Sequence, residues 1–304
     1  MKRRSFFKNL ALGSAVVATG GSSAVSGTLE PLSERKKGKV ALKIAYITDV
    51  HIRANARDRF KNCLTEISKS KVDFFLNGGD SVFAVDYKNI TRETVFELWD
   101  IWDDCRKSMD SKEVHSCLGN HDMWWAAPTK EDEMYGKEYA VKRLGIPNRY
   151  YSFERGGWHF IVLDGNKGGG NVSLDTEQFE WLKSELGKLK ANTPVLIMSH
   201  YPVLGVTTQW QKDYYQDFQE IKKLFYIHRD KVKIYLSGHT HLLENIEYNG
   251  VKYLGNGAVS GSWWGTGGPT SAGPGYMQET PPGYSILTLY NNGEVESQYH
   301  PHKF

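Results

Sequence analysis

The chain has 304 residues, of which 40% are hydrophobic and 24% are charged, proportions that are ordinary for a globular protein. The formal net charge is +3, but without Lys2, Arg3, Arg4 and Lys8 near the N-terminus 34 basic residues face 35 acidic ones, a net charge of −1. A nearly neutral body lacks the basic surface of a protein that binds duplex nucleic acid, so the composition disfavours a DNA-binding protein or a nuclease.

Residues 1–26 have the pattern of an export signal. A basic start, MKRRSFFKN, is followed by a weakly apolar stretch, LALGSAVVATG, and by small residues, GSSAVSG. Arg3 and Arg4 resemble the pair of a bacterial twin-arginine signal, so we expect the precursor to use the twin-arginine export machinery and the protein to be periplasmic or secreted. A stable membrane anchor is the alternative, but the stretch is shorter than the ~20 apolar residues that span a bilayer.

Residues 41–304 are expected to form one domain, preceded by a polar tether at 27–40. After the leader roughly 270 to 280 residues remain, enough to bury a single core. Apolar runs that predict strands alternate with helical patterns at 57–70 and 91–108 and with a capped helix start at Asp175. Near the C-terminus, VKYLGNGAV and YSILTLYNNGEVESQYH predict antiparallel closing strands. This alternation indicates an α/β fold, or more broadly an α+β fold.

A short polar cluster follows each of five apolar runs, which are ALKIAYIT, VDFFLNG, EVHSCL, TPVLIM and KVKIYLS. In chain order the clusters are Asp49-Val50-His51, Gly79-Asp80, Gly119-Asn120-His121-Asp122, Ser199-His200 and Gly238-His239-Thr240-His241. Strands that end in this way would bring the clusters to one edge of a sheet. Together the clusters supply two carboxylates, one amide oxygen and four imidazoles suited to metal binding. Structural His and Asp residues scattered through an α/β domain are the alternative explanation.

The mixture of ligand types indicates which metals would bind. Carboxylate and amide oxygens combined with neutral imidazole nitrogens suit borderline divalent metals such as Mn, Fe, Zn or Ni, whereas an all-oxygen set would suit Mg or Ca. Two such ions ~3.5–4 Å apart can bridge one water, lower its pKa towards ~7 and hold a phosphate ester for in-line attack. Hydrolysis of a phosphoester is therefore the leading interpretation.

The ordered motifs D-x-H, G-D, G-N-H-D, H and G-H-x-H resemble those of the calcineurin-like metallophosphoesterases, over roughly residues 41 to 258. The resemblance implies two metal ions (Mn, Fe or Zn), which share a bridging hydroxide as the nucleophile. It implies seven ligands, with Asp49, His51 and His241 on the first metal, Asn120, His200 and His239 on the second, and Asp80 bridging both. It also implies that His121 stabilises or protonates the leaving oxygen, with Asp122 holding the His121 ring.

Two departures from related motifs narrow the subfamily. Purple acid phosphatases have a tyrosine ligand three residues after the bridging aspartate, whereas this chain has Phe83, which cannot coordinate a metal. Some lipid-linked members continue the last motif with Gly-Gly-Gln, whereas this chain continues with Leu242-Leu243-Glu244. The remaining resemblance is to the group that includes class III cyclic-nucleotide phosphodiesterases and exported bacterial phosphoesterases.

Four tryptophans are candidates for contact with the substrate beyond its phosphate. Trp124 and Trp125 follow the G-N-H-D motif, and Trp263 and Trp264 lie in the Gly-rich segment 255–276. Their rings could stack on a base, a sugar or an aromatic leaving group. The alternative is that they are packing residues, in the second case within a surface loop.

The sequence therefore predicts a two-sheet β-sandwich flanked by helices, with a dinuclear metal site at the strand ends. The predicted activity is metal-dependent hydrolysis of a small phosphoester, with phosphodiesters slightly favoured over phosphomonoesters. The non-enzymatic alternative is a metal-binding or ligand-sensing module that kept the fold without turnover. The presence of both Asp80 and His121 disfavours that alternative.

The leader generates the first testable prediction. Replacing Arg3 and Arg4 together by lysine should leave the precursor in the cytoplasm, because the twin-arginine route reads the arginine pair. Cell fractionation followed by immunoblotting measures the distribution. Unchanged delivery to the periplasm would show that the leader is read by another route.

Overall fold

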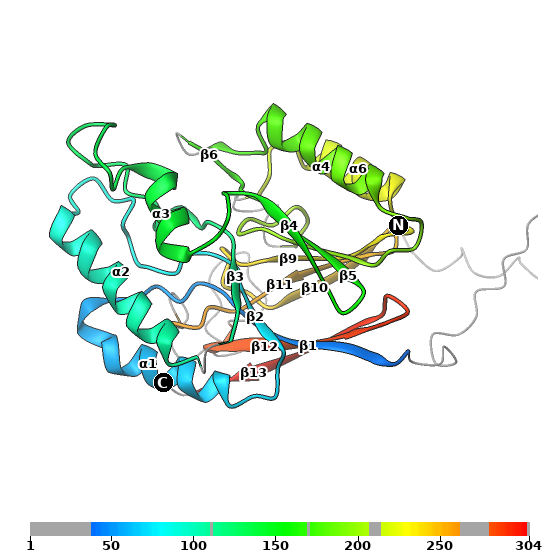
Figure 1. Ribbon diagram of the computed structural model, residues 1–304, viewed down its shortest axis with the longest axis horizontal. Coiled ribbons are helices and arrows are strands. Elements are labelled where there is room, and N and C mark those ends of the chain that lie inside the picture. Colours follow the sequence, from blue (N-terminus) through cyan, green and yellow to red (C-terminus); the bar gives the residue numbers. More distant parts are fainter. Residues whose placement is uncertain (1–37, 110–111, 169–170, 207–213, 262–279, 303–304) are drawn as a thin grey trace, which may run out of the picture. The chain divides into compact units, whose positions relative to one another are not determined.

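The computed structural model describes residues 38–109, 112–168, 171–206, 214–261 and 280–302. Residues 37–304 form one compact unit, in which two β-sheets lie between groups of helices (Figure 1). The two-sheet sandwich expected from the sequence is confirmed.

The two sheets have five and six strands. Their orders are β13-β12-β1-β2-β3 and β10-β11-β9-β8-β5-β4. The first sheet consists of β1 (Val40–Ile47), β2 (Phe74–Asn77), β3 (Val114–Ser116), β12 (Gly283–Tyr290) and β13 (Val295–Pro301). The second consists of β4 (Tyr151–Arg155), β5 (Trp158–Val162), β8 (Val195–Met198), β9 (Val232–Ser237), β10 (Glu244–Tyr248) and β11 (Val251–Gly255). A short pair, β6 (Asn166–Gly168) and β7 (Asn171–Val172), follows β5.

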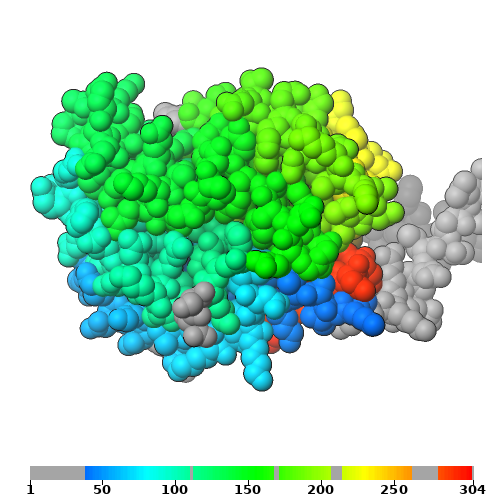
Figure 2. All heavy atoms as spheres, viewed as in Figure 1, coloured from blue at the N-terminus to red at the C-terminus, as the bar shows by residue number. Residues whose placement is uncertain are grey.

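Helices cover the outer sides of the sheets, and in the space-filling view the green segments, which include α3 and α4, cover much of one face (Figure 2). They are η1 (Ala54–Ala56), α1 (Arg57–Ser68), α2 (Arg92–Lys107), η2 (Asn120–Asp122), α3 (Gly136–Leu144), α4 (Thr176–Lys188) and α6 (Phe218–Ile227). The helices predicted at 57–70, at 91–108 and after Asp175 are confirmed, and the Asp175 carboxylate caps α4 by accepting a hydrogen bond from Gln178 N at 2.9 Å. Among the described residues, no helix is both long and apolar enough to span a bilayer.

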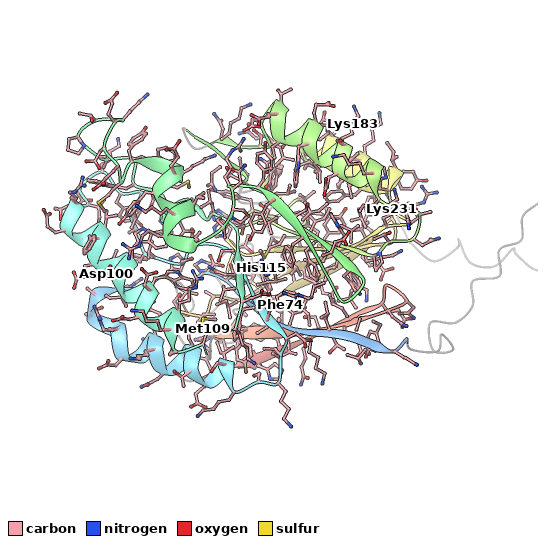
Figure 3. The ribbon with its side chains drawn as sticks, in the orientation of Figure 1. Phe74, Asp100, Met109, His115, Lys183 and Lys231 are labelled. Carbon is pink, nitrogen blue, oxygen red and sulfur yellow. The ribbon has the colours of Figure 1, made fainter. Side chains whose placement is uncertain are left out.

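Aromatic rings join the two sheets. Phe74 on β2 and His115 on β3, both labelled in Figure 3, have ring centroids 5.5 Å apart. Across the sandwich, Phe74 meets Phe160 of β5 at 5.5 Å, and His115 stacks on Phe153 of β4 at 3.7 Å. Ring pairs at these separations stabilise beyond the apolar area that they bury. The contacts hold the sheets in one relative position, so the ends of strands from both sheets meet at a fixed edge.

Parallel pairing brings the polar clusters to that edge. β1, β2 and β3 pair in parallel, as do β5, β8, β9 and β11. The clusters follow the carboxyl ends of β1, β2, β3, β8 and β9, which therefore open on the same side of the sandwich, as in other open α/β sheets.

The prediction of antiparallel closing strands is partly wrong. β12 and β13 do form an antiparallel hairpin, but β11 pairs in parallel with β9 and antiparallel with β10. The reason is that β10 lies at the outer edge and runs back along the sheet, so the chain returns beside β9 in the direction of β9.

Candidate metal centre

Strained backbone positions carry most of the proposed ligands. The φ angle is positive at Asp49 (53°), His51 (48°), Asp80 (52°), His239 (64°) and His241 (55°). Non-glycine residues pay about 1–3 kcal/mol for such conformations and keep them only where the surroundings impose them. Here backbone hydrogen bonds do so, since Asp49 N donates to Gly79 O at 3.0 Å and His51 N donates to Asp80 O at 2.9 Å. The ligand-bearing loops are thus held in shape by each other.

The first ligand group, Asp49, His51 and His241, converges on one point. His51 Nε2 lies 3.2 Å from His241 Nε2, and Asp49 Oδ1 lies 3.1 Å from His241 Nε2 and 3.7 Å from His51 Nε2. All three residues are buried. Ligand atoms that lie this close together leave room for a single ion between them.

The second ligand group, Asn120, His200 and His239, converges on a neighbouring point. His200 Nε2 lies 3.2 Å from Asn120 Oδ1 and 3.2 Å from His239 Nδ1. The orientation of the His200 ring is fixed, because its Nδ1 donates to Gly78 O at 2.8 Å, so that Nε2 faces the group.

The carboxylate of Asp80 lies between the two groups. Its Oδ2 is 3.8 Å from His51 Nε2 in the first group and 3.3 Å from His200 Nε2 in the second. Its other oxygen, Oδ1, accepts a hydrogen bond from His121 N at 2.8 Å. One oxygen of Asp80 therefore faces both groups, which is the placement that a bridging ligand requires.

Asp49 shows directly that the residues fit a cation. Its Oδ2 accepts hydrogen bonds from Thr48 Oγ1 at 2.7 Å and from His239 N at 3.2 Å. Its Oδ1 is buried and lies 3.1 Å from His241 Nε2, but it accepts no well-aligned hydrogen bond from the described residues. A carboxylate oxygen buried against imidazoles without a well-aligned donor is costly, and a divalent ion would supply the missing interaction. The donor set of oxygens and imidazole nitrogens suits the same borderline metals as the sequence predicts.

Burial and neighbouring charges set the protonation of the ligands. Burial lowers the pKa of His51 to about 3, and burial together with His200 lowers that of His239 to about 3, so both rings are neutral at pH 7. Burial alone would raise the pKa of Asp49, but His241 lowers it to about 2. In contrast, Asp80 outweighs the effect of burial on His200 and raises the pKa of His200 to about 9.

His121 is oriented by Asp86, which the sequence analysis did not identify. His121 Nδ1 and Asp86 Oδ1 form a short hydrogen bond, whereas in the described part of the chain Asp122 forms no hydrogen bond or ion pair with the His121 ring. The expected role of Asp122 is therefore wrong. Its two oxygens instead accept hydrogen bonds from four backbone amides, those of Asp80, Ser81, Val82 and Gly119, at 2.8–3.3 Å. Asp122 thus holds the loop that carries the bridging carboxylate.

A calcineurin-like phosphoesterase family model matches residues 42–243, a span that contains all seven proposed ligands. The chain belongs to the calcineurin-like phosphoesterase family. The resemblance drawn from the motifs is confirmed, and the two neighbouring ligand groups agree with a family of phosphoester hydrolases.

Individual relatives of this phosphoesterase include both phosphatases and a diesterase. It is 27% identical over 247 residues to purple acid phosphatase 23 of Arabidopsis thaliana, covering 72% of this chain but only about half (51%) of the plant protein. It is 26% identical over 272 residues to a 3′,5′-cyclic-nucleotide phosphodiesterase of Nostoc sp., covering 84% of this chain and 90% of that protein.

Solved structures share the fold. A dimetal phosphatase of Danio rerio superposes with a TM-score of 0.60 at 14% identity, covering 85% of this chain and 99% of that one. GAP50, described as the anchor in the inner membrane complex of Plasmodium, superposes with a TM-score of 0.57 at 18% identity, covering 85% and 84%. At these identities the similarity establishes the fold alone.

The tryptophans proposed as substrate contacts have different positions. Trp124 is buried in the core, at 3% exposure, so its predicted contact with substrate is wrong. Trp124 pairs with Gly136 in a short β-bridge, and because side chains alternate along extended chain, the next residue, Trp125, points outward and lies against Tyr135. A substrate contact by Trp125 stays a prediction. Trp263 and Trp264 lie outside the described residues, and their proposed role also stays a prediction.

Gly119 provides a test of the bridging position. A Cβ at Gly119 would lie 2.1 Å from both N and Oδ1 of Asp80, so Gly119→Ala should displace that carboxylate and lower the content of both metals, measured by mass spectrometry of the purified protein. Gly187→Ala on α4 is the matched control, because apart from the neighbouring backbone of its own helix nothing lies within 4 Å of the added methyl group. The control should keep its metals and gain up to ~1 kcal/mol of stability. Full metal content in Gly119→Ala would contradict the bridging geometry.

His200 provides a pH-dependent prediction. Before metal binds, a pKa of about 9 keeps the His200 ring doubly protonated at pH 7.5, and the proton on Nε2 must leave when that nitrogen coordinates. Metal affinity should therefore rise with pH up to about pH 9, and uptake at pH 7.5 should release about one proton per chain. Isothermal titration calorimetry in two buffers of different ionisation enthalpy measures this number. Uptake without proton release would show that His200 is neutral beforehand or is not a ligand.

Proposed function

We propose that this phosphoesterase hydrolyses small phosphoesters at a pair of divalent metal ions, with phosphodiesters favoured over phosphomonoesters. The observation that carries the proposal is the position of Asp80 Oδ2 between two separate ligand groups, 3.8 Å from His51 and 3.3 Å from His200. Mn, Fe and Zn are the proposed metals. When bound, such ions act as Lewis acids and activate water.

His121 is proposed as the residue that donates a proton to the leaving oxygen. Burial would lower its pKa, but the hydrogen bond with Asp86 and the nearby charge of Asp80 raise that pKa above the usual value for histidine. The ring is therefore more often protonated near neutral pH than a free imidazole. Because Asp86 occupies Nδ1, the other nitrogen, Nε2, is the one available to a substrate.

The proposed preference for diesters is supported by the length of each relative that aligns with this chain. The alignment spans 90% of the Nostoc cyclic-nucleotide phosphodiesterase but only 51% of the plant purple acid phosphatase. The position three residues after Asp80 also differs from the expected tyrosine ligand, because Phe83 stands there with its ring centroid 5.7 Å from that of His51. Export through the twin-arginine route, with activity in the periplasm, is part of the same proposal and depends on residues 1–26.

A panel of substrates tests the proposed activity. The Mn-loaded protein should hydrolyse bis-p-nitrophenyl phosphate faster than p-nitrophenyl phosphate, and cyclic nucleotides serve as a third class. A faster rate on the monoester would reverse the order of preference. Metal uptake without turnover on any member of the panel would favour the non-enzymatic module.

Asp80→Asn and His121→Ala should fail in different ways. Asp80→Asn should lower both metal content and activity, because both ligand groups face that carboxylate. His121→Ala should keep the metals and slow the reaction by about 10²–10⁴-fold, most for substrates with poor leaving groups.

Equal metal loss in both variants would show that His121 is itself a ligand. The two variants separate these roles, since a His121 ring nitrogen lies within 4.8 Å of the ligand atoms of His51 and Asp80.

A further inference from the structure

Backbone pairing continues beyond the ends of β1 and β2. Ile52 and Val82 form an isolated parallel bridge, in which Ile52 N donates to Ser81 O at 3.0 Å and Phe83 N donates to Ile52 O at 3.1 Å. The next residues in this register are Arg53 and Phe83. Their proximity is therefore imposed by the same loops that carry His51 and Asp80.

Arg53 lies over the ring of Phe83. Its Cζ is 3.9 Å from the ring centroid, well within the range of a cation–π contact. The residue is exposed, and its guanidinium forms no ion pair or hydrogen bond with any residue in the ranges that the structure describes. By comparison, Arg57, four positions along, is paired with Asp104 at 2.6 Å. Arg53 is thus a preorganised cation whose donors are not used by the described residues.

This cation stands beside His121. The Phe83 ring centroid lies 5.8 Å from that of His121, and combining this distance with the 3.9 Å of the cation–π contact places Arg53 Cζ within about 10 Å of the His121 ring. Tyr87, which is 48% exposed, also lies beside His121, with its ring centroid 5.7 Å from that of His121. The Phe83 ring is also 5.7 Å from that of His51, so Arg53 stands at the edge of the site that His51 and His121 share. If His121 faces the leaving oxygen, as the proposed function requires, a charged group on the leaving group extends into the region that Arg53 borders.

We propose that Arg53 binds an anionic group carried by the leaving group, so that the preferred substrates are phosphoesters with a second negative charge beyond the scissile bond. A carboxylate and a second phosphate share the chemistry that a guanidinium recognises, namely two acceptor oxygens matched to its fork of donors. Contact with the Phe83 ring reduces the conformational entropy that Arg53 would lose on binding, because the Arg53 side chain is already held in one conformation. The inference depends on the proposed function.

Matched substrates test the role of Arg53. The pair is phenyl phosphate and 4-carboxyphenyl phosphate, together with their methyl diesters, so that a leaving-group charge is the main difference within each pair. Hydroquinone bisphosphate replaces the carboxylate by a second phosphate and shows which anion is preferred. The Mn-loaded wild-type protein should have a kcat/KM about tenfold higher for the charged member, expressed mainly in KM, as expected for a charge-assisted contact that solvent partly screens.

Three variants separate this role from general electrostatics. Arg53→Gln should abolish the preference for the charged member, and Arg53→Lys should retain only part of it, because lysine keeps the charge but lacks the planar fork. Arg57→Gln removes an equal charge nearby and should leave the preference intact.

Two results would overturn the inference. One is an equal loss on both members of a pair in Arg53→Gln, which would place Arg53 on the scissile phosphate itself. The other is an unchanged preference in that variant. Failure of the proposed function would look different, since the wild-type protein would then hydrolyse no member of either pair.

Discussion

A buried carboxylate shared between two clusters of imidazoles is the interaction on which the metal centre depends. Burial alone would raise the pKa of Asp80, but His200, His121 and His51 hold it well below its usual range, so the carboxylate is charged although it is only 1% exposed. A buried charge of this kind costs several kcal/mol unless partners surround it. The imidazoles and the proposed cations are those partners, and the geometry of the site follows from the need to bring them together.

The fold supplies this geometry through loops that approach one another closely at glycine residues. At Gly119, any larger residue would collide with Asp80, and at Gly238 a Cβ would lie 2.1 Å from Thr48 Oγ1 and 2.5 Å from Asp49 Oδ2. The glycines of the G-N-H-D and G-H-x-H motifs therefore permit close approach of the loops. Asp122 adds to this support, because it accepts hydrogen bonds from four backbone amides of two loops. Burial and the charge of Asp80 raise the pKa of Asp122 to about 7.

The sequence predicted the parts of the structure that depend on repeated local patterns. Each ligand cluster follows an apolar run, so the convergence of Asp49, Asp80 and His200 could be inferred from the parallel arrangement of strands alone. The direction of β11 could not, because it depends on whether the short strand before it pairs at the outer edge. Trp124 and Trp125 were also indistinguishable in sequence, since only the β-bridge at Gly136 decides which ring turns inward.

Asp86 was missed for a different reason. It lies six residues after Asp80, in a loop with no periodic pattern, and its approach to His121 depends on a turn in which Ala84 has a positive φ of 58°. Nothing in the sequence around an aspartate near a G-D motif indicates which side chain it will contact. The position of Arg53 could not be predicted either, because its contact with Phe83 depends on the register between two loops and not on any motif. Both positions depend on contacts between segments that are separate in sequence, which a local sequence pattern does not reveal.

We propose that the two ligand groups share Asp80. Anomalous diffraction at the Mn absorption edge, from crystals of the Mn-loaded protein, tests this arrangement. Two peaks ~3.5–4 Å apart are expected, one among Asp49, His51 and His241, the other among Asn120, His200 and His239, with Asp80 Oδ2 in contact with both. A single peak, or a second peak that does not contact Asp80, would contradict it.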